Sequence, residues 1–294
     1  MFLLLLVVVL GVIEFAISKY PDRLDHLQRS AAKQIECDWP PAPTAAGTAD
    51  GTATATDGTA TATANWTATA TGGRGGFAGV DDILVLSLKA RTDRRVMMQK
   101  MLEFFELPFL FVDAVDKQAL NISGQEACKQ SHLGILDRSI AEGKTFLVME
   151  DDLDFDASFP VVLQLGLEQL HAADPNWDVL YIFEKHGAKN KLVGPNVMKG
   201  LTSMHFGAVG FVVRPKGAAL MKKAALKFPD LPVDHEYAHA VEHFGLRIYV
   251  IQPTVVEHVG SSILSDVSNM IDVPGPYEPK RFKASMYKAL SGKY

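Results

Sequence analysis

The sequence has little cysteine and no excess of basic residues, and both shortages exclude classes of protein. Its 294 residues include only 2 cysteines, Cys37 and Cys128, so a fold held together by several disulfides is excluded. The two thiols can stay free or form one intermolecular bond, and neither is expected to be catalytic. Lys and Arg number 29 against 34 Asp and Glu, which gives a formal net charge of −5. Without surplus cations to neutralise a phosphate backbone, the chain is not expected to bind nucleic acid.

The sequence also lacks an uninterrupted apolar run long enough to cross a bilayer. The N-terminal run from Phe2 to Ile13 stops at Glu14, short of the roughly 20 residues that a spanning helix needs. It matches the apolar part of a secretory signal, with Ala16 and Ser18 as small residues before a cleavage point. We therefore expect a signal peptide over residues 1–18, or a short signal anchor that attaches the chain to a membrane. Either segment leads to the secretory pathway, in the ER or Golgi lumen, or to secretion.

The composition then predicts three further segments. Residues 19–41 are polar and contain prolines, whereas residues 42–79 are almost entirely Ala, Thr and Gly. Such a tract cannot bury enough surface to fold, so we expect a disordered stalk, glycosylated on its threonines or unmodified. The sequons Asn65-Trp66-Thr67 and Asn121-Ile122-Ser123 add two candidate N-glycosylation sites. A catalytic domain is expected over residues 80–275, followed by a basic C-terminal tail over residues 276–294.

After Val80, short apolar runs alternate with amphipathic stretches, and this alternation predicts an α/β domain. Strands are expected at residues 83–88, 109–112, 145–149, 177–183, 206–213 and 246–252. Thr92 is expected to cap the first helix, and Ser123 with Glu126 forms a capping box for a helix that runs to Gly143. Two more helices are expected at residues 216–227 and 234–244.

An acidic cluster follows the predicted strand 145–149 directly. Glu150, Asp151 and Asp152 come first, and Asp154 and Asp156 follow. Ligands of open α/β sheets bind beyond the carboxyl ends of the strands, so carboxylates there are suited to a hard divalent cation and a phosphate. The alternative is a solvated acidic loop in which Asp156 or Ser158 caps the next helix.

Eight segments in order resemble glycosyltransferase family 25, which contains bacterial lipooligosaccharide glycosyltransferases and animal collagen hydroxylysine galactosyltransferases. The resemblance covers about residues 82–268. The matching segments are 86–95 with its Arg-x-Asp-Arg motif, 111–116, the Cys-x-x-Ser-His helix in 123–136, the acidic motif in 148–153, 177–183, 210–221, 232–237 and the ending from Pro253 through His258 to Ser265-Asp266.

The resemblance implies a GT-A type, Rossmann-like domain that binds a nucleotide sugar, with a mixed sheet and helices on both faces. The acidic motif then acts as the Asp-x-Asp of that fold and holds Mn2+ or Mg2+. Asp152 is the expected metal ligand, Glu150 contacts metal or nucleotide, Asp151 contacts nucleotide, and His258 is a further metal ligand. The implied activity is metal-assisted transfer of a hexose, with galactose suggested, from a UDP-linked donor to a glycan or glycoprotein acceptor.

The resemblance also assigns roles outside the acidic motif. Arg91 and Arg94 follow the first strand, where the guanidinium fork suits phosphate or uracil, and their alternative role is to form the solvated face of the helix. Ser131 and His132 become nucleotide-sugar-binding residues only through the family match. Asp234 is the candidate general base of an inverting reaction, and its alternative role is that of a helix N-cap.

Two rival functions remain. His235-Glu236-Tyr237-Ala238-His239 has the His-Glu-x-x-His pattern of zinc hydrolases, in which two His bind Zn2+ and the Glu is the base. The other rival is a non-catalytic relative that binds glycans or a partner. The acidic motif, Arg94 and Asp234 together favour catalysis over this second alternative.

Overall fold

The structure is a computed structural model that describes residues 66–67, 76–183, 190–200, 207–259 and 285–291. The expected signal segment 1–18, the polar segment 19–41, Cys37, Asn65 and Ser265-Asp266 lie outside these residues. Among the helices described, none combines the length and the hydropathy that a bilayer crossing requires.

A mixed sheet of 9 strands forms the centre of the domain, in the order β1-β3-β2-β4-β9-β6-β10-β8-β7. These strands are β1 (Trp66–Thr67), β2 (Asp82–Ser87), β3 (Leu110–Asp113), β4 (Phe146–Glu150), β6 (Val179–Tyr181), β7 (Asn190–Gly194), β8 (Val197–Gly200), β9 (Gly210–Val213) and β10 (Ile248–Ile251). Strand β2 runs parallel to β3 and β4, whereas β9 is antiparallel to both β4 and β6. A small second sheet pairs β5 (Leu153–Phe155) with β11 (Val256–His258).

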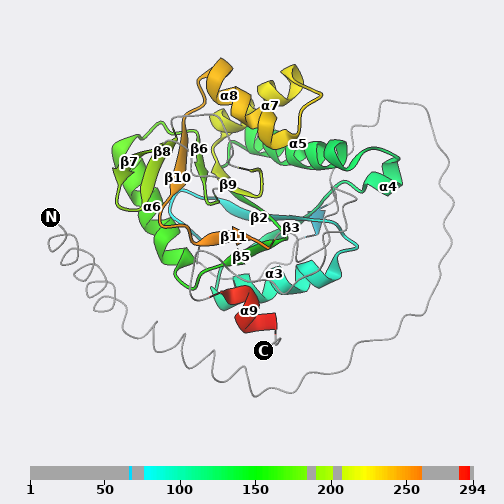
Figure 1. The fold of residues 1–294 in the computed structure, drawn as a ribbon, viewed down its shortest axis with the longest axis horizontal. Coiled ribbons are helices and arrows are strands. Elements are labelled where there is room, and N and C mark those ends of the chain that lie inside the picture. The colour runs from blue at the N-terminus through cyan, green and yellow to red at the C-terminus, as the bar shows by residue number, and fades with distance from the viewer. Residues whose placement is uncertain (1–65, 68–75, 184–189, 201–206, 260–284, 292–294) are drawn as a thin grey trace. The chain divides into compact units, whose positions relative to one another are not determined.

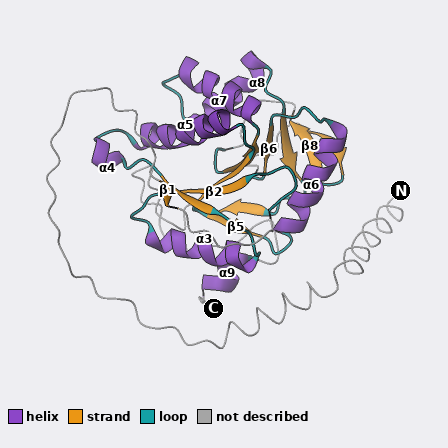
Figure 2. Cartoon of the chain, turned by 180° about the vertical axis from the view of Figure 1, so that it is seen from behind, coloured by secondary structure: helices purple, strands orange, loops and turns teal. Residues whose placement is uncertain are grey.

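Helices cover both faces of the large sheet (Figures 1 and 2). One face carries α5 (Gly124–Glu142), α7 (Pro215–Lys227) and α8 (Val233–Phe244), and the other carries α3 (Thr92–Phe104), α6 (Phe159–Ala173) and α9 (Met286–Ser291). The short helix α4 (Lys117–Leu120) precedes α5. This arrangement confirms the predicted α/β architecture, a Rossmann-like mixed sheet between two layers of helices.

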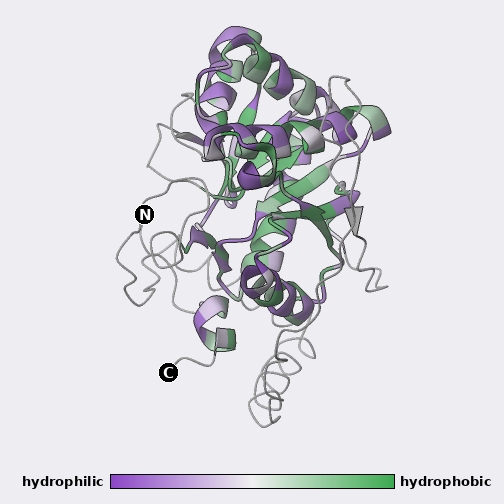
Figure 3. Ribbon diagram, turned by 90° about the vertical axis from the view of Figure 1, so that its right-hand side faces the viewer, coloured by the Kyte–Doolittle hydropathy of each residue, from purple (hydrophilic) through white to green (hydrophobic). Residues whose placement is uncertain are grey.

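Alternate residues of each central strand belong to two separate cores. In β2, Ile83 and Val85 pack with α3 and α6, whereas Leu84 and Leu86 pack with α5, α7 and α8. Both faces of the strand are therefore buried, and this explains why its sequence is a continuous apolar run instead of an alternation of apolar and polar residues. Figure 3 shows the central strands in green between helices that carry both green and purple residues.

The predicted N-cap is confirmed for α5, and Ser158 occupies the N-cap of α6 as one alternative predicted, whereas the N-caps of α3 and α8 are other residues. Ser123 Oγ accepts a hydrogen bond from the Glu126 amide at 3.1 Å, and Gly143 ends α5 in the left-handed conformation with φ 64°. The N-cap of α3 is Arg91 and not Thr92, which is already the first helical residue. The N-cap of α8 is Pro232, so the alternative role of Asp234 as an N-cap is wrong.

The folded part extends beyond residues 80 and 275 on both sides. Phe77, within the expected stalk, is buried and packs edge-on against Phe159 with ring centroids 6.0 Å apart. Ser285, within the expected tail, donates to Asp154 Oδ2 at 2.6 Å, and the Tyr287 amide donates to Asp154 Oδ1 at 2.8 Å. Asp154 is completely buried, so this member of the acidic cluster anchors α9 and does not face a ligand.

Candidate active site

The acidic motif lies at the carboxyl ends of three adjacent parallel strands, as the sequence predicts. Register pairs Leu86 of β2 with Glu150 of β4 and Ser87 of β2 with Asp113 of β3. A cavity of about 270 Å³ opens at this edge. Its lining includes apolar residues at and just after the ends of β2 and β3, cationic residues at the starts of α3 and α4, and Glu150, Asp151 and Asp152.

Arg94 is the cation that allows consecutive carboxylates to be buried together. Its Nη1 lies 2.9 Å from Asp151 Oδ1 and 3.3 Å from Asp152 Oδ2, and the Arg94 side chain is only 6% exposed. Burial of unpaired charges costs several kcal/mol, and a guanidinium between two carboxylates offsets that cost. The sequence assigned Arg94 to the nucleotide, whereas its guanidinium binds the acidic motif.

Asp151 is held inside the wall of the cavity. Ser87 Oγ donates to its Oδ2 at 2.6 Å, while Arg94 occupies its other oxygen. Burial raises the pKa of Asp151 to about 6, although Arg94 and the Ser87 hydrogen bond oppose the rise. With both oxygens engaged, Asp151 has a supporting position in the site.

Asp152 and His258 form a second ion pair. His258 Nε2 lies 3.1 Å from Asp152 Oδ2. Burial alone would raise the pKa of Asp152, but His258 and Arg94 outweigh it and hold that pKa below its ordinary value. Burial likewise would lower the pKa of His258, but the Asp152 carboxylate outweighs it and raises that pKa.

One oxygen of Asp152 makes the site suitable for a cation. Asp152 Oδ1 is buried and has no hydrogen-bond partner among the residues described. A buried carboxylate oxygen without a donor is costly, and a bound divalent cation satisfies it. The Asp152 carboxylate and the neighbouring His258 imidazole therefore offer two ligands for a divalent metal, although among the described residues they are not part of a group of three ligand-type side chains.

Glu150 belongs to a different cluster from Asp152. His132 Nε2 lies 3.0 Å from Glu150 Oε1, and the His132 ring is fully buried, stacked on Phe211 with centroids 6.1 Å apart. Ligand-type atoms of Cys128, His132 and Glu150 all lie within 4.8 Å of one another. The structure thus brings Asp152 and His258 together but places Glu150 with His132 and Cys128.

Asp234 does not line the cavity, but its charge acts on one member of this second cluster. Its Oδ1 accepts from the His235 amide at 3.0 Å. Burial raises the pKa of the Cys128 thiol, and the charges of Glu150 and Asp234 raise it further. Asp234 also adds to the raised pKa of Tyr181, which is chiefly due to burial.

Arg91 and Ser131, the two remaining candidates, both line the cavity but differ in their hydrogen bonds. Arg91 lines the cavity, with its Nη2 3.0 Å from Asp93 Oδ2. Ser131 also lines the cavity, but its hydroxyl donates to the Ala127 carbonyl at 2.7 Å and accepts from the Val115 amide at 2.8 Å. Ser131 therefore fixes the loop after β3 to α5.

The zinc-hydrolase hypothesis does not fit the structure. Glu236, its expected base, is fully buried and lies 2.6 Å from Lys129 Nζ. Within the described part of the chain, neither His235 nor Glu236 belongs to a group of side chains close enough to hold a metal. A buried, ion-paired carboxylate cannot activate a zinc-bound water.

Sequence reasoning missed several residues of the site. Ser87, which holds Asp151, is the last residue of a buried strand at the same edge as Glu150, and that position could have identified it. Lys117 follows β3 at this edge and lines the cavity, so the same argument applies.

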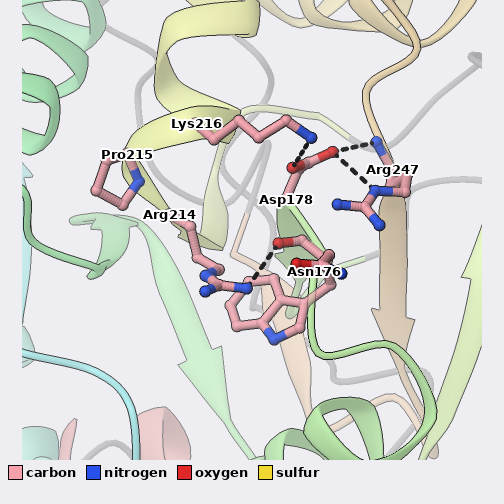
Figure 4. A pocket seen from close by; sticks show the side chains of 7 residues that line it. Asn176, Asp178, Arg214, Pro215, Lys216 and Arg247 are labelled. Atoms are coloured by element: carbon pink, nitrogen blue, oxygen red, sulfur yellow. Dashed lines mark hydrogen bonds and ion pairs between the residues drawn. The ribbon is translucent and has the colours of Figure 1, made fainter.

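A larger cavity, of about 610 Å³, lies at the opposite edge of the sheet (Figure 4). Its charged side chains are paired with one another: Lys216 lies 3.1 Å and Arg247 lies 3.3 Å from Asp178. Arg214 donates to the carbonyls of Pro175 and Trp177 at 2.7 and 3.2 Å. These contacts join β6, β9 and β10 at their ends, so we place the candidate active site in the smaller cavity with the acidic motif.

No family model matches the sequence. Procollagen galactosyltransferase 1 of Danio rerio is 26% identical over 223 residues, which cover 60% of this chain and 36% of that protein. Procollagen galactosyltransferase 2 of Homo sapiens is 26% identical over 60% of this chain and 35% of its own length. The inactive glycosyltransferase 25 family member 3 of Homo sapiens is 28% identical over 53% of this chain and 31% of its own length.

Among solved structures, a mannose-1-phosphate geranyltransferase from Thermus thermophilus aligns with a TM-score of 0.32 and 11% identity, over 60% of this chain and 61% of that chain. A likeness this weak carries no argument. The chain spans about a third of the length of the curated relatives it matches. Its sequence is similar to procollagen galactosyltransferases and to other glycosyltransferase 25 family members, and this confirms the resemblance that the order of its motifs predicts.

Proposed function

We propose that the domain transfers a hexose, galactose by analogy with its relatives, from a UDP-linked donor to a hydroxyl of a glycan or glycoprotein. The observation that carries the proposal is the carboxylate motif at the end of β4, which lines a cavity and includes a buried Asp152 oxygen with no hydrogen-bond partner in the described part of the chain. The similarity to procollagen galactosyltransferases supports galactose and a glycoprotein acceptor.

The cavity offers both surfaces that a nucleoside diphosphate requires. Leu88, Ala114 and Val115 give an apolar wall for a base, and Arg91 and Lys117 give cations for phosphate oxygens. Because ligands of α/β sheets bind at the carboxyl ends of the strands, this edge is the expected place for the donor. Arg94 has a different role and keeps the acidic motif in place.

Asp152 and His258 would hold the divalent metal, Mn2+ or Mg2+, with Glu150 facing it or the ribose. When bound, such an ion acts as a Lewis acid and stabilises the negative charge that develops on the departing nucleoside diphosphate. Neighbouring residues of the protein hold these carboxylates in place. Arg94 orients Asp152, and His132 orients Glu150 through its 3.0 Å hydrogen bond.

Asp234 is our candidate general base for an inverting reaction. Inversion requires a carboxylate that takes the proton of the acceptor hydroxyl as it attacks the face opposite the leaving group. Asp234 lies at the start of α8, outside the donor cavity, and its charge contributes to the raised pKa values of Cys128 and Tyr181. That location suits a group that contacts the acceptor hydroxyl instead of the nucleotide.

The apolar N-terminal segment supports a lumenal or secreted location, where glycoprotein acceptors are found. Residues 1–18 then serve as a signal peptide or as the membrane anchor. A non-catalytic relative that binds glycans is the second candidate, because one similar human protein is named inactive. The two candidates differ in whether nucleotide sugar is turned over.

A screen of nucleotide sugars for metal-dependent hydrolysis tests this proposal without knowledge of the acceptor. We expect release of UDP from UDP-galactose in the presence of Mn2+ and its loss in Asp152→Asn. Asp156→Asn is the matched control, because Asp156 belongs to the same acidic segment but hydrogen-bonds Ser158 outside the cavity. Metal-dependent binding without turnover of any nucleotide sugar or added acceptor would favour the non-catalytic alternative.

A further inference from the structure

A second cluster of metal-ligating side chains lies on the last two turns of α8. It consists of His239, Glu242 and His243, whose ligand atoms all lie within 4.8 Å of one another. The spacing i, i+3 and i+4 places the three side chains on one face of the helix. None of them lines the donor cavity, and none belongs to the proposed active site.

The two imidazoles are already arranged side by side. The rings of His239 and His243 stack with centroids 5.5 Å apart and an interplanar angle of 28°. Phe228, at the end of α7, packs against both rings with centroid distances of 4.6 and 5.3 Å. This packing limits the rotamers of both His side chains and reduces the entropy that a bound ion would have to overcome.

His239 and Glu242 already bring two ligand-type atoms together. His239 Nδ1 lies 3.5 Å from Glu242 Oε2, and the His239 side chain is 34% exposed. A metal ion between an imidazole nitrogen and a carboxylate oxygen replaces this long contact with two coordination bonds. Glu242 and His243 are exposed, so an ion can enter from solvent.

The helix itself favours a cation at this position. Helix α8 ends at Phe244, and Gly245 caps it in the left-handed conformation with φ 67°. The carbonyl end of a helix carries a partial negative charge, which attracts cations. The Glu242 carboxylate in the last turn adds a full negative charge to it.

We propose that His239, Glu242 and His243 bind a transition-metal ion of the Zn2+ class, with water in the fourth position. Two imidazole nitrogens and one carboxylate oxygen at a tetrahedral ion form a common zinc ligand set. Imidazole favours Zn2+ over Mg2+ and Mn2+, so this site differs in selectivity from the carboxylate site at β4. The inference stands independently of the transferase proposal.

This ligand set is displaced by one helical turn from the His-Glu-x-x-His pattern. The pair that binds is His239 with His243, and not His235 with His239. Glu236 stays buried against Lys129, so the site holds an ion without the base of a hydrolase. We therefore expect the ion to stabilise the end of α8 and its contact with Phe228.

The test is zinc binding by the full chain, with ZnCl2 as the probe and bound zinc measured by mass spectrometry after buffer exchange. We expect His243→Ala and His239→Ala each to lose one zinc per chain relative to the unmodified protein. His235→Ala is the matched control, because it removes an exposed imidazole from the same helix. It should retain the zinc, as should Asp152→Asn.

Cobalt gives a second readout, because Co2+ in a tetrahedral site with nitrogen ligands absorbs visible light, whereas Zn2+ does not. We expect a visible band in the unmodified protein and in His235→Ala, and its loss in His243→Ala with an unchanged circular dichroism spectrum. Equal zinc content in His243→Ala and the unmodified protein would overturn the proposal. Loss of zinc in His235→Ala with retention in His243→Ala would also overturn it, in favour of the original pattern.

Discussion

Replacement of Arg94 by methionine tests whether the acidic motif depends on this one guanidinium. Methionine keeps an unbranched side chain of similar reach but removes the charge. In Arg94→Met, Asp151 and Asp152 lose the cation that lies 2.9 and 3.3 Å away, at a position where Arg94 is only 6% exposed. Removing one partner of a buried ion pair typically costs about 3–5 kcal/mol of unfolding free energy.

For a domain of this size, about 1 kcal/mol corresponds to roughly 2–4 °C in melting temperature, so the expected loss is roughly 6–20 °C. The assay is urea unfolding followed by circular dichroism, with EDTA present so that no divalent ion replaces the guanidinium. Arg91→Met is the matched control, because its partner Asp93 is 65% exposed, and such surface pairs contribute at most about 1 kcal/mol. Equal unfolding free energies for the two variants would refute the reasoning.

Three other outcomes follow from contacts at α5 and α8. Lys129→Met should lower the free energy of unfolding in urea by about 3–5 kcal/mol, because it leaves the buried Glu236 without its cation. The double variant with Glu236→Leu should recover most of that loss, and an equally unstable double variant would contradict this. Native Cys128 should resist iodoacetamide at pH 8, since its raised pKa leaves little thiolate, and rapid labelling detected by mass spectrometry would be the contrary result. Asp234→Asn should keep the melting temperature, because asparagine also accepts from the His235 amide, while turnover falls by about 100-fold; near-full turnover would remove Asp234 as the base.

The sequence predicted those parts of the fold and site that depend on local pattern. The apolar run that ends at Glu150 identified both a buried strand and the edge of the sheet where ligands bind. Ser123 and Gly143 defined the ends of α5 because a cap and a left-handed glycine are local signals. The periodicity of apolar residues in the sequence predicts which residues are buried but not which residues they contact.

The remaining features depend on contacts between distant segments. Composition alone placed Asp154 in the acidic cluster beside Asp152, yet the hydrogen bonds that Asp154 accepts from Ser285 and Tyr287 make it structural. The position of Arg94 after the first strand suggested a phosphate ligand, and only the tertiary structure shows it buried against two carboxylates. Glu236 matched a catalytic pattern in the sequence, but Lys129 from another helix neutralises it.

The central claim is that the carboxylate site at the end of β4 binds a nucleotide through a divalent metal, and calorimetry with UDP-galactose measures this most directly. We expect binding with Mn2+ or Mg2+ and no detectable binding with EDTA. In Asp152→Asn we expect no difference between these conditions, because Asp152 Oδ1 is the buried oxygen for which the described residues offer no hydrogen-bond partner. Equal affinity for UDP-galactose with and without EDTA would contradict the account.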